Sequence, residues 1–249
     1  MQTDRVMTEA RGAVLRISMN RPEKKNALTL EMYDGLTAAL ARAESDDALR
    51  VAVLIGAPGI FTAGNDLGDF MKSPPTGTDS PVLRFLHKLA TFKKPLIAAV
   101  DGPAVGIGTT LLFHCDMVVA TDRARFHMPF TKLGLVPEGA SSLLVPALVG
   151  RQRATSWLML GKPFDAKEAH QAGLVYEVVA PDVLDASAMA LANQICELPR
   201  EAVLLTKGLL RDAGEKLVLE TIATEGKMFI ERLQSAETLA AMMAFMTKR

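Results

Sequence analysis

The chain has 249 residues, of which 49% are hydrophobic, 5% aromatic and 22% charged, a composition typical of a folded domain and not of a disordered chain. Lys plus Arg and Asp plus Glu each number 28, so no global field attracts nucleic acid or an anionic membrane surface. Cys115 and Cys196 form neither a disulfide framework nor a zinc motif. We therefore expect one catalytic domain with no nucleic-acid or membrane partner.

The two ends of the chain and its apolar runs bear on its compartment. The first residues, "MQTDRVMTEARG", contain an acid near their start and lack the apolar run of a secretory signal. No apolar run reaches the roughly 20 residues of a membrane span, and the final "FMTKR" differs from the Ser-Lys-Leu peroxisomal address. The sequence therefore predicts a cytoplasmic protein.

The first fifty residues predict a hairpin and a helix. The segment "VMTEARGAVLRISMN" (6–20) has β-branched, partly alternating residues around a turn at Arg11 and Gly12, which favours two paired strands. After the break "NRPEKKNALT" (20–29), apolar residues recur at helical spacing over 30–40, and Thr29 is a suitable N-cap.

The middle of the chain repeats one plan twice, in which a buried strand leads into a Gly-rich loop and then a helix. The strand 51–56 precedes "APGIFTAGNDLGDF" (57–70), which ends in a helical turn. After a helix at 81–91, the strand 95–100 precedes "DGPAVGIG" (101–108), a helix at 109–114 and a strand at 115–120. The two loops are therefore expected to be structurally equivalent.

The remainder of the chain is mainly helical in pattern. Helices are predicted at 140–149, 151–160, 165–172, 182–196, 199–211 and 215–246, with one strand at 174–179 and breaks at Pro199 and Gly214. The last helix carries an apolar stripe that needs a partner surface, made by Leu219, Ile222, Phe229, Leu233, Leu239, Met243 and Met246. We expect a core over residues 1–196 and a helical C-terminal region over 197–249.

Five blocks of sequence resemble one known family. These are "NRPEKKNALT", "FTAGNDL", "DGPAVGIG", "CDMVVA" and "GKPFDAKEAHQAGLVYEVV", which in order and spacing resemble the crotonase superfamily, or enoyl-CoA hydratase/isomerase family. Within the chain, "GNDL" (64–67) and "FHMPF" (126–130) most resemble the Δ3,Δ2-enoyl-CoA isomerase branch of peroxisomal type. The resemblance implies an α/β crotonase (ClpP-like) spiral of repeated ββα units with a helical C-terminal trimerisation region. It also implies an acyl-CoA thioester substrate, a homotrimer or dimer of trimers, and no cofactor other than the CoA of the substrate.

Reactions at the α-carbon of a thioester pass through an enolate, which requires N–H donors at its oxygen. The family motifs place these donors on the backbone of Asn65 and Ile107, although the family usually has Gly at the second position. Alternatively, both loops are ordinary strand-to-helix turns. The same match assigns substrate-binding positions to Ala63, Gly64, Asp66, Leu67, Gly106 and Leu135.

The family's hydratases use two glutamates, and in this chain the corresponding positions hold Thr110 and Phe130. Glu138 occupies the position of the isomerases' catalytic glutamate, and one carboxylate is sufficient to move a proton from C2 to C4. Taken alone, without the resemblance, Glu138 is interpreted as a helix-start acid favoured by the helix dipole. Asp66 and Asp69 are reserve candidates, with Asp66 also suited to N-capping.

Other polar residues give weaker signals. The resemblance assigns the CoA phosphates to Arg21, Lys24 and Lys25. Lys207 and Arg211 are weaker candidates, and each of these cations is alternatively part of a solvated charge run. His87 and His170 are expected at the surface, His114 as a cation at a helix end, and His127 as a possible pocket residue. No spacing of His and Cys indicates a metal site.

Three functions remain open from the sequence. The first is a Δ3,Δ2-enoyl-CoA isomerase with Glu138 as its acid and base. The second is an enoyl-CoA hydratase or another reaction of the family on a CoA thioester, with Asp66 or Asp69 as the acid. The third is a non-catalytic acyl-CoA-binding module.

Overall fold

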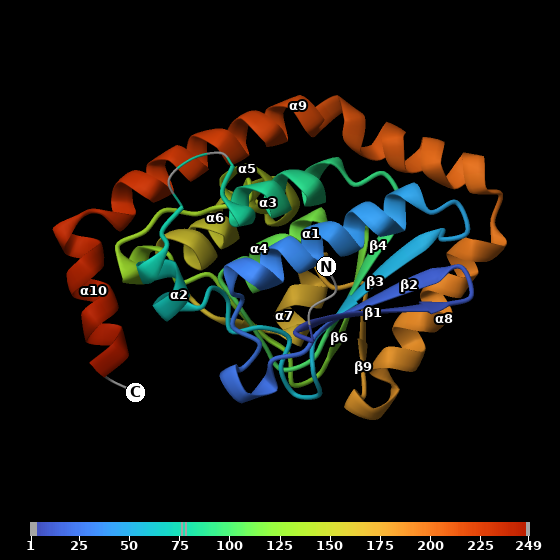
Figure 1. Cartoon of the computed structure of the whole chain (residues 1–249), viewed down its shortest axis with the longest axis horizontal. Coiled ribbons are helices and arrows are strands. Elements are labelled where there is room, and N and C mark those ends of the chain that lie inside the picture. The colour runs from blue at the N-terminus through green and yellow to red at the C-terminus, as the bar shows by residue number, and fades with distance from the viewer. Residues whose placement is uncertain (1–3, 76, 78, 248–249) are drawn as a thin grey trace.

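The structure, a computed structural model, describes residues 4–75, 77 and 79–247. Its larger sheet has six strands in the order β1-β2-β3-β4-β6-β9, and Figure 1 shows helices on both of its sides. The expected hairpin is confirmed as the antiparallel pair β1 and β2, and the other strands pair in parallel. Their bounds are β1 Val6–Arg11, β2 Val14–Met19, β3 Val51–Ile55, β4 Leu96–Val100, β6 Met117–Thr121 and β9 Glu177–Val179.

The central strands are apolar throughout because both faces of the sheet are covered. In β3, Val51, Val53 and Ile55 lie in a cluster with α8 (Leu184–Glu197), whereas Ala52 and Leu54 lie in the main core with α1 (Leu30–Ser45) and α3 (Pro81–Thr91). The period of two along each strand therefore divides the core into two layers. Each fully buried aliphatic side chain contributes about 1.5–3 kcal/mol.

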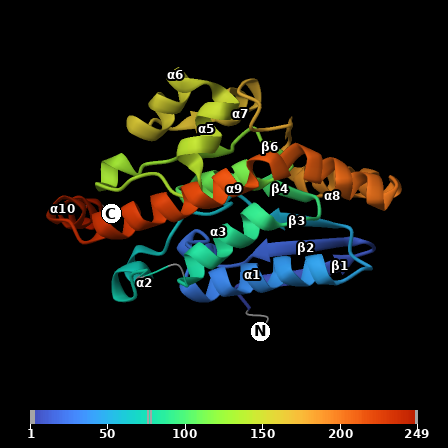
Figure 2. The ribbon, with the colours of Figure 1, turned by 90° about the horizontal axis from the view of Figure 1, so that it is seen from above.

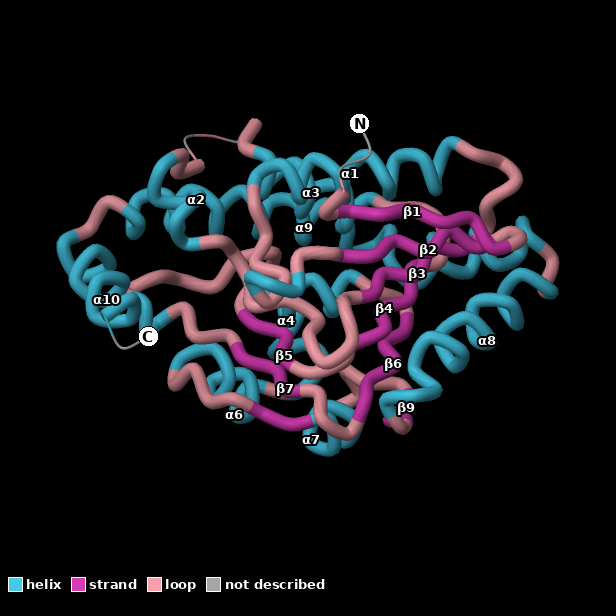
Figure 3. The backbone as a smooth tube through the Cα atoms, turned by 60° about the horizontal axis from the view of Figure 1, so that its bottom comes forward, coloured by secondary structure: helices cyan, strands magenta, loops and turns pink. Residues whose placement is uncertain are grey.

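A second sheet of three short strands was not predicted. It consists of β5 Pro103–Val105, β7 Arg125–His127 and β8 Phe164–Asp165, in the order β5-β7-β8. Figure 3 shows these strands as a group apart from the large sheet. Strands of two or three residues contain too few positions to display a period of two, which is why the sequence pattern did not reveal them.

The helices otherwise follow the expected order, and their repetition with the strands gives the expected spiral of ββα units. Thr29 caps α1, and its side chain accepts a hydrogen bond from the Met32 amide. The helix expected at 109–114 begins earlier, at Ile107. The remaining helices are η1 Pro22–Lys24, α2 Leu67–Lys72, α4 Ile107–Thr110, η2 Leu111–His114, η3 Thr131–Leu133, α5 Ser141–Val149, α6 Arg151–Ala154, the π-helix η4 Thr155–Met159, α7 Ala166–Gln171 and η5 Pro181–Val183.

The break predicted at Gly214 is wrong. Helix α9 runs without interruption over Arg200–Leu233, and the chain turns instead before α10, Ala236–Thr247. An isolated Gly costs a helix only about 1 kcal/mol relative to Ala, which a helix of this length offsets by packing. The Ser235 hydroxyl accepts a hydrogen bond from the Thr238 amide at the start of α10.

Helix α9 lies across the molecule over α3 and α5, as Figures 1 and 2 show. The predicted apolar stripe runs from α9 into α10. Its members Ile222 and Phe229 on α9 are buried, whereas Leu239 and Met243 on α10 are exposed. The side chain of Met246 lies outside the described residues. The C-terminal region therefore covers part of the core within one chain. None of the helices described is long and apolar enough to cross a membrane.

Candidate active site

The two Gly-rich loops lie side by side in matched register. Thr62 and Ala104 form a parallel bridge, in which the Thr62 amide donates to the Pro103 carbonyl and the Val105 amide donates to the Thr62 carbonyl, both at 3.0 Å. A Cβ on Gly64, whose φ is +86°, would lie 2.7 Å from the Val105 carbonyl oxygen. Only glycine therefore permits this contact between the loops.

Each loop presents a backbone N–H three residues beyond that bridge. Asn65 follows Thr62 by three positions and Ile107 follows Ala104 by three. The amides on either side of Asn65 are engaged, at Gly64 with the Thr62 hydroxyl and at Asp66 with the Leu28 carbonyl. Ile107 is the first residue of α4, where an amide has no partner within the helix. Within the described residues neither N–H has an acceptor, so the two donors are available to an anion.

Glu138 lies on the turn that leads into α5. The turn is formed by Gly139 and Ala140, both at positive φ (+69° and +57°), and Glu138 is only 6% exposed. Its Oε1 accepts a hydrogen bond of 2.5 Å from the hydroxyl of Thr110. Its Oε2 is buried and has no hydrogen-bond partner in the described part of the chain. One oxygen is thus held in place and the other is free to accept a proton.

The surroundings of Glu138 raise its pKa to about 8. Burial is the main cause, because removing a carboxyl group from water disfavours its charged form. The Thr110 hydrogen bond lowers the pKa, and the charge of Glu225 raises it. A carboxyl with a pKa near neutral pH is suited to accept a proton and return it.

We expect Thr110→Val to raise the pKa of Glu138 further, by about one unit, because valine keeps the shape and removes the hydroxyl that stabilises the carboxylate. A base must be ionised, so the rise of kcat/KM with pH should move to higher pH, and a pH profile measures this. Thr109→Val, which removes a neighbouring buried hydroxyl bonded to the Ala104 carbonyl, should leave the midpoint of that rise in place. A profile that Thr110→Val does not move would contradict this assignment.

Glu138 and Asn65 line the same small cavity. Its other lining residues are apolar and come from the segment after the first loop, from α3 and from α9: Phe70, Pro75, Val82, Leu83, Leu86, Gly226, Phe229 and Ile230. Phe130, at the second hydratase position, is buried and packs edge-on against Phe229. An apolar wall therefore adjoins the carboxylate and one of the donors.

This geometry belongs to a chain that matches a known protein family over almost its whole length. The model of the enoyl-CoA hydratase/isomerase family matches residues 9–249. The chain belongs to the enoyl-CoA hydratase/isomerase family. Enzymes of this family, the crotonase superfamily, act on acyl-CoA thioesters, and the α/β fold with its helical C-terminal region is that of the family.

Three similar proteins indicate the range of the family. Enoyl-CoA delta isomerase 2 of Rattus norvegicus is 36% identical over 251 residues, covering 98% of this chain and 64% of the rat protein. The chain therefore spans less than two thirds of that relative. The 1,2-epoxyphenylacetyl-CoA isomerase of Escherichia coli strain K12 is 34% identical, covering 98% and 96% of the two chains. The solved structure of Pseudomonas aeruginosa OdaA has a TM-score of 0.96 and 41% identity, covering 98% and 99%.

The reserve acids of this family member are already engaged. The Asp66 carboxylate caps α2 through the Asp69 amide and pairs with Arg21 at 2.6 Å, and this pairing lowers the pKa of Asp66 against the effect of burial. Asp69 accepts a hydrogen bond of 2.9 Å from the Leu30 amide at the start of α1. Asp66 is therefore the N-cap that the sequence allowed, and both acids hold helices in place. The other positions assigned to substrate (Ala63, Gly64, Leu67, Gly106, Leu135) lie on or beside the two loops and the turn before Glu138.

Some of the cations predicted to bind the CoA phosphates are already bonded to other groups of the protein, and others are exposed. Arg21 donates to the Asp66 carboxylate and to the Ala27 carbonyl, so its charge is used within the loop. Lys24 and Lys25 are exposed and remain candidates. The weaker candidate Lys207 is wrong, because its ammonium is buried between the carboxylate of Asp116 and a backbone carbonyl, and burial lowers its pKa to about 8.

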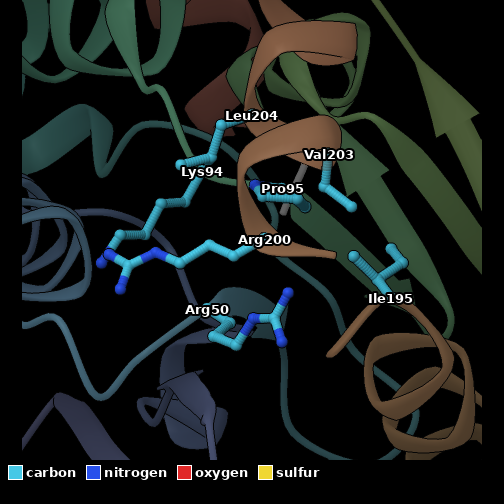
Figure 4. A pocket seen from close by; sticks show the side chains of 7 residues that line it. All are labelled: Arg50, Lys94, Pro95, Ile195, Arg200, Val203 and Leu204. Atoms are coloured by element: carbon cyan, nitrogen blue, oxygen red, sulfur yellow. The ribbon is translucent and has the colours of Figure 1, made fainter. Parts of the chain in front are cut away.

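A second small cavity, shown in Figure 4, has three cations in its lining: Arg50, Lys94 and Arg200. The Arg50 guanidinium donates to two carbonyl groups at the end of α8. The Lys94 ammonium donates to the carbonyls of Ala43 and Asp46 at the end of α1 and to that of Leu49 in the segment after it. Arg200 pairs with Asp47. Arg50 and Lys94 thus stabilise the negative ends of two helices and Arg200 is already paired, so the cavity offers little to an anionic ligand.

The predicted surface positions are confirmed for two of the four histidines. His87 and His170 are exposed as expected. The prediction of a cationic His114 is wrong: its ring is buried, and burial lowers its pKa to about 4. Its Nε2–H donates to the Gly139 carbonyl at 2.8 Å, which supports the turn beside Glu138. His127, predicted as a pocket residue, is not among the described residues that line the cavity of Glu138, and its ring bonds the Gly161 carbonyl.

Sequence reasoning missed two buried residues around Glu138. The Tyr33 hydroxyl donates to Oδ1 of Asn65, and burial followed by the charge of Glu138 raises the pKa of Tyr33. Glu225 of α9 lies beneath the turn at Gly139 and Ala140. Tyr33 sits at a helical core spacing and Glu225 on a helix far along the chain, so neither carries a local signal of its role.

Proposed function

We propose that this protein is an enoyl-CoA isomerase that moves a double bond from C3 to C2 of an enoyl-CoA thioester. The observation that carries the proposal is the free Oε2 of Glu138 in a cavity that Asn65 also lines. Among the described residues lining that cavity, Glu138 is the only acid. Thr110 and Phe130 at the hydratase positions supply no second carboxylate.

The proposed reaction needs one acid-base group and one oxyanion site. The carboxylate of Glu138 removes a proton from C2, and the electrons pass through the thioester to form a dienolate. The N–H groups of Asn65 and Ile107 stabilise the negative oxygen. The Glu138 carboxyl then returns the proton at C4, so the double bond moves and the carboxylate is regenerated. No water is consumed.

The apolar wall fits this chemistry because it keeps water away from the dienolate. The cavity has a volume of about 20 Å³, on the scale of one water molecule. An acyl chain therefore enters only if side chains of the wall move apart.

The exposed side chains of Leu205, Leu209 and Leu210 on α9 support the trimeric assembly that we infer for the protein.

The isomerase proposal is tested with purified protein and a 3-enoyl-CoA. We expect formation of the conjugated 2-enoyl-CoA, followed by its ultraviolet absorbance, at a rate well above that of water addition to 2-enoyl-CoA. Faster hydration than isomerisation would instead identify a hydratase. Binding of acyl-CoA by calorimetry without turnover of either substrate would identify a non-catalytic binding module.

A further inference from the structure

Helix α9 brings a buried carboxylate to the turn that carries Glu138. Glu225 is 6% exposed. Its Oε2 accepts a hydrogen bond of 2.6 Å from the Ala140 amide, and its Oε1 accepts one of 2.8 Å from the Ser142 amide. These amides belong to the first turn of α5, whose N-cap residue is Ala140. Glu225 therefore caps α5 from 85 residues away in sequence.

The cap occupies a site that would also attract the carboxylate of Glu138. The N-terminus of a helix carries a partial positive charge and free amides, which attract a nearby carboxylate. Glu138 precedes α5 by three residues. Because Glu225 fills these amides, the Glu138 carboxylate bonds only the Thr110 hydroxyl among the described residues and keeps Oε2 free.

The cap also fixes an unfavourable backbone conformation. Ala140 has a φ of +57°, which a residue with a Cβ adopts at a cost of about 1 kcal/mol or more. Its amide bond to Glu225 and the His114 bond to the Gly139 carbonyl hold the turn from two sides. The direction of the Glu138 side chain follows from this turn.

We propose that Glu225 is a positioning residue that captures the amino end of α5, so that the Glu138 carboxyl stays clear of the helix end and available as the acid and base of the site. This inference rests on the proposed function of Glu138. It adds that the C-terminal helix controls the ionisation of the site through a second carboxylate.

Polar groups of the described residues face the two carboxylates from five elements, including the Ser142 hydroxyl of α5, which bonds Glu225. Glu138 faces the Thr110 hydroxyl from α4, the Tyr33 hydroxyl from α1 and the charge of Glu225 from α9. His114 from η2 is neutral, because its pKa is lowered by burial. Burial raises the pKa of Glu225, whereas the bonds from Ser142 and Ala140 lower it. No cation offsets the repulsion between the two carboxylates among these groups.

The first experiment compares the pH dependence of isomerase turnover in the wild type and in Glu225→Gln. Loss of the second charge and exposure of the helix end both favour ionised Glu138. The rise of kcat with pH should therefore shift to lower pH by about one unit. Glu231→Gln, which removes an exposed carboxylate from the same helix, should leave the profile unchanged. Glu225→Asp keeps the charge and should stay nearer the wild-type midpoint than Glu225→Gln.

A second readout does not depend on activity. The folded pKa of Glu138 is raised from 4.5 to about 8, so the stability that its proton supplies is present below pH 4.5 and is lost as pH rises through about 8. Glu138→Gln should therefore gain stability relative to the wild type between pH 6 and pH 9. In the Glu225→Gln background this gain in stability should be clearly smaller. The measurement is urea unfolding, at pH 6 and at pH 9, of the wild type, Glu138→Gln, Glu225→Gln and the double variant.

The outcomes separate the two claims. If no variant isomerises but the gain from Glu138→Gln depends on residue 225, the proposed function fails and the role of Glu225 stands. If Glu225→Gln lowers kcat without moving the profile, and the gain is equal in both backgrounds, Glu225 is only structural and the inference is overturned. Should Glu225→Gln not fold, Glu225→Ser, which leaves room for water at the two amides, takes its place with the same expected shifts.

Discussion

Replacement of Glu138 by glutamine is expected to lower isomerase turnover by about 10³-fold or more. Glutamine keeps the length of the side chain and an oxygen that accepts the Thr110 hydrogen bond, but it cannot take up the C2 proton. Because the proposed mechanism uses the same carboxyl to return the proton at C4, both steps are lost together. The measurement is kcat with a 3-enoyl-CoA at pH 9, where wild-type Glu138 is mostly ionised.

The effect should appear in kcat and not in KM, because the carboxylate is proposed to act on the reacting proton and not to hold the ground-state thioester. The exposed Glu231→Gln variant, which loses the same charge elsewhere, should retain wild-type turnover. If a folded Glu138→Gln enzyme kept undiminished turnover, Glu138 would not be the acid and base, and Asp66 and Asp69 would become the candidates. Both of these carboxylates are already bonded to other groups, so we expect neither to replace Glu138.

Local sequence patterns were sufficient to predict most of the helices and strands. The buried runs of β3 and β4, the Thr29 cap and the helical spacing of α1 and α3 predicted those elements within a few residues. The small sheet was missed because its strands are too short for a period to show. Gly214 was overinterpreted because the cost of one glycine is small beside the tertiary packing of a long helix.

The residues of the candidate site could be predicted from local motifs, but the contacts between them could not. The sequence placed Asn65, Ile107 and Glu138 through the motifs of two loops and a turn, and the structure puts Glu138 and Asn65 at one cavity. The bond from Thr110 to Glu138 and the cap by Glu225 join residues distant in the chain. No periodicity or spacing encodes such contacts, so only the folded structure reveals what sets the pKa of Glu138.

A direct test of the oxyanion site is available at Ile107, because proline removes a backbone N–H and is well tolerated as the first residue of a helix. Ile107 holds that position in α4. The preceding Gly106 has φ and ψ of +57° and −120°, a mirror-image extended conformation that only glycine adopts readily. Glycine also has no Cβ to clash with the proline ring.

Ile107→Pro should lower kcat by about 10²–10³-fold, the range for loss of one oxyanion donor. The Ile107 side chain is buried, so any substitution also disturbs packing. Ile107→Ala is therefore the matched control: it removes more of the side chain, at a cost of about 2–5 kcal/mol of stability, but retains the N–H. If the proline and alanine variants, both folded, turned over at the same rate, the Ile107 amide would not hold the dienolate oxygen. A large deficit confined to proline would assign the loss to one hydrogen bond and not to the core, since the alanine variant shares the packing defect and keeps the donor.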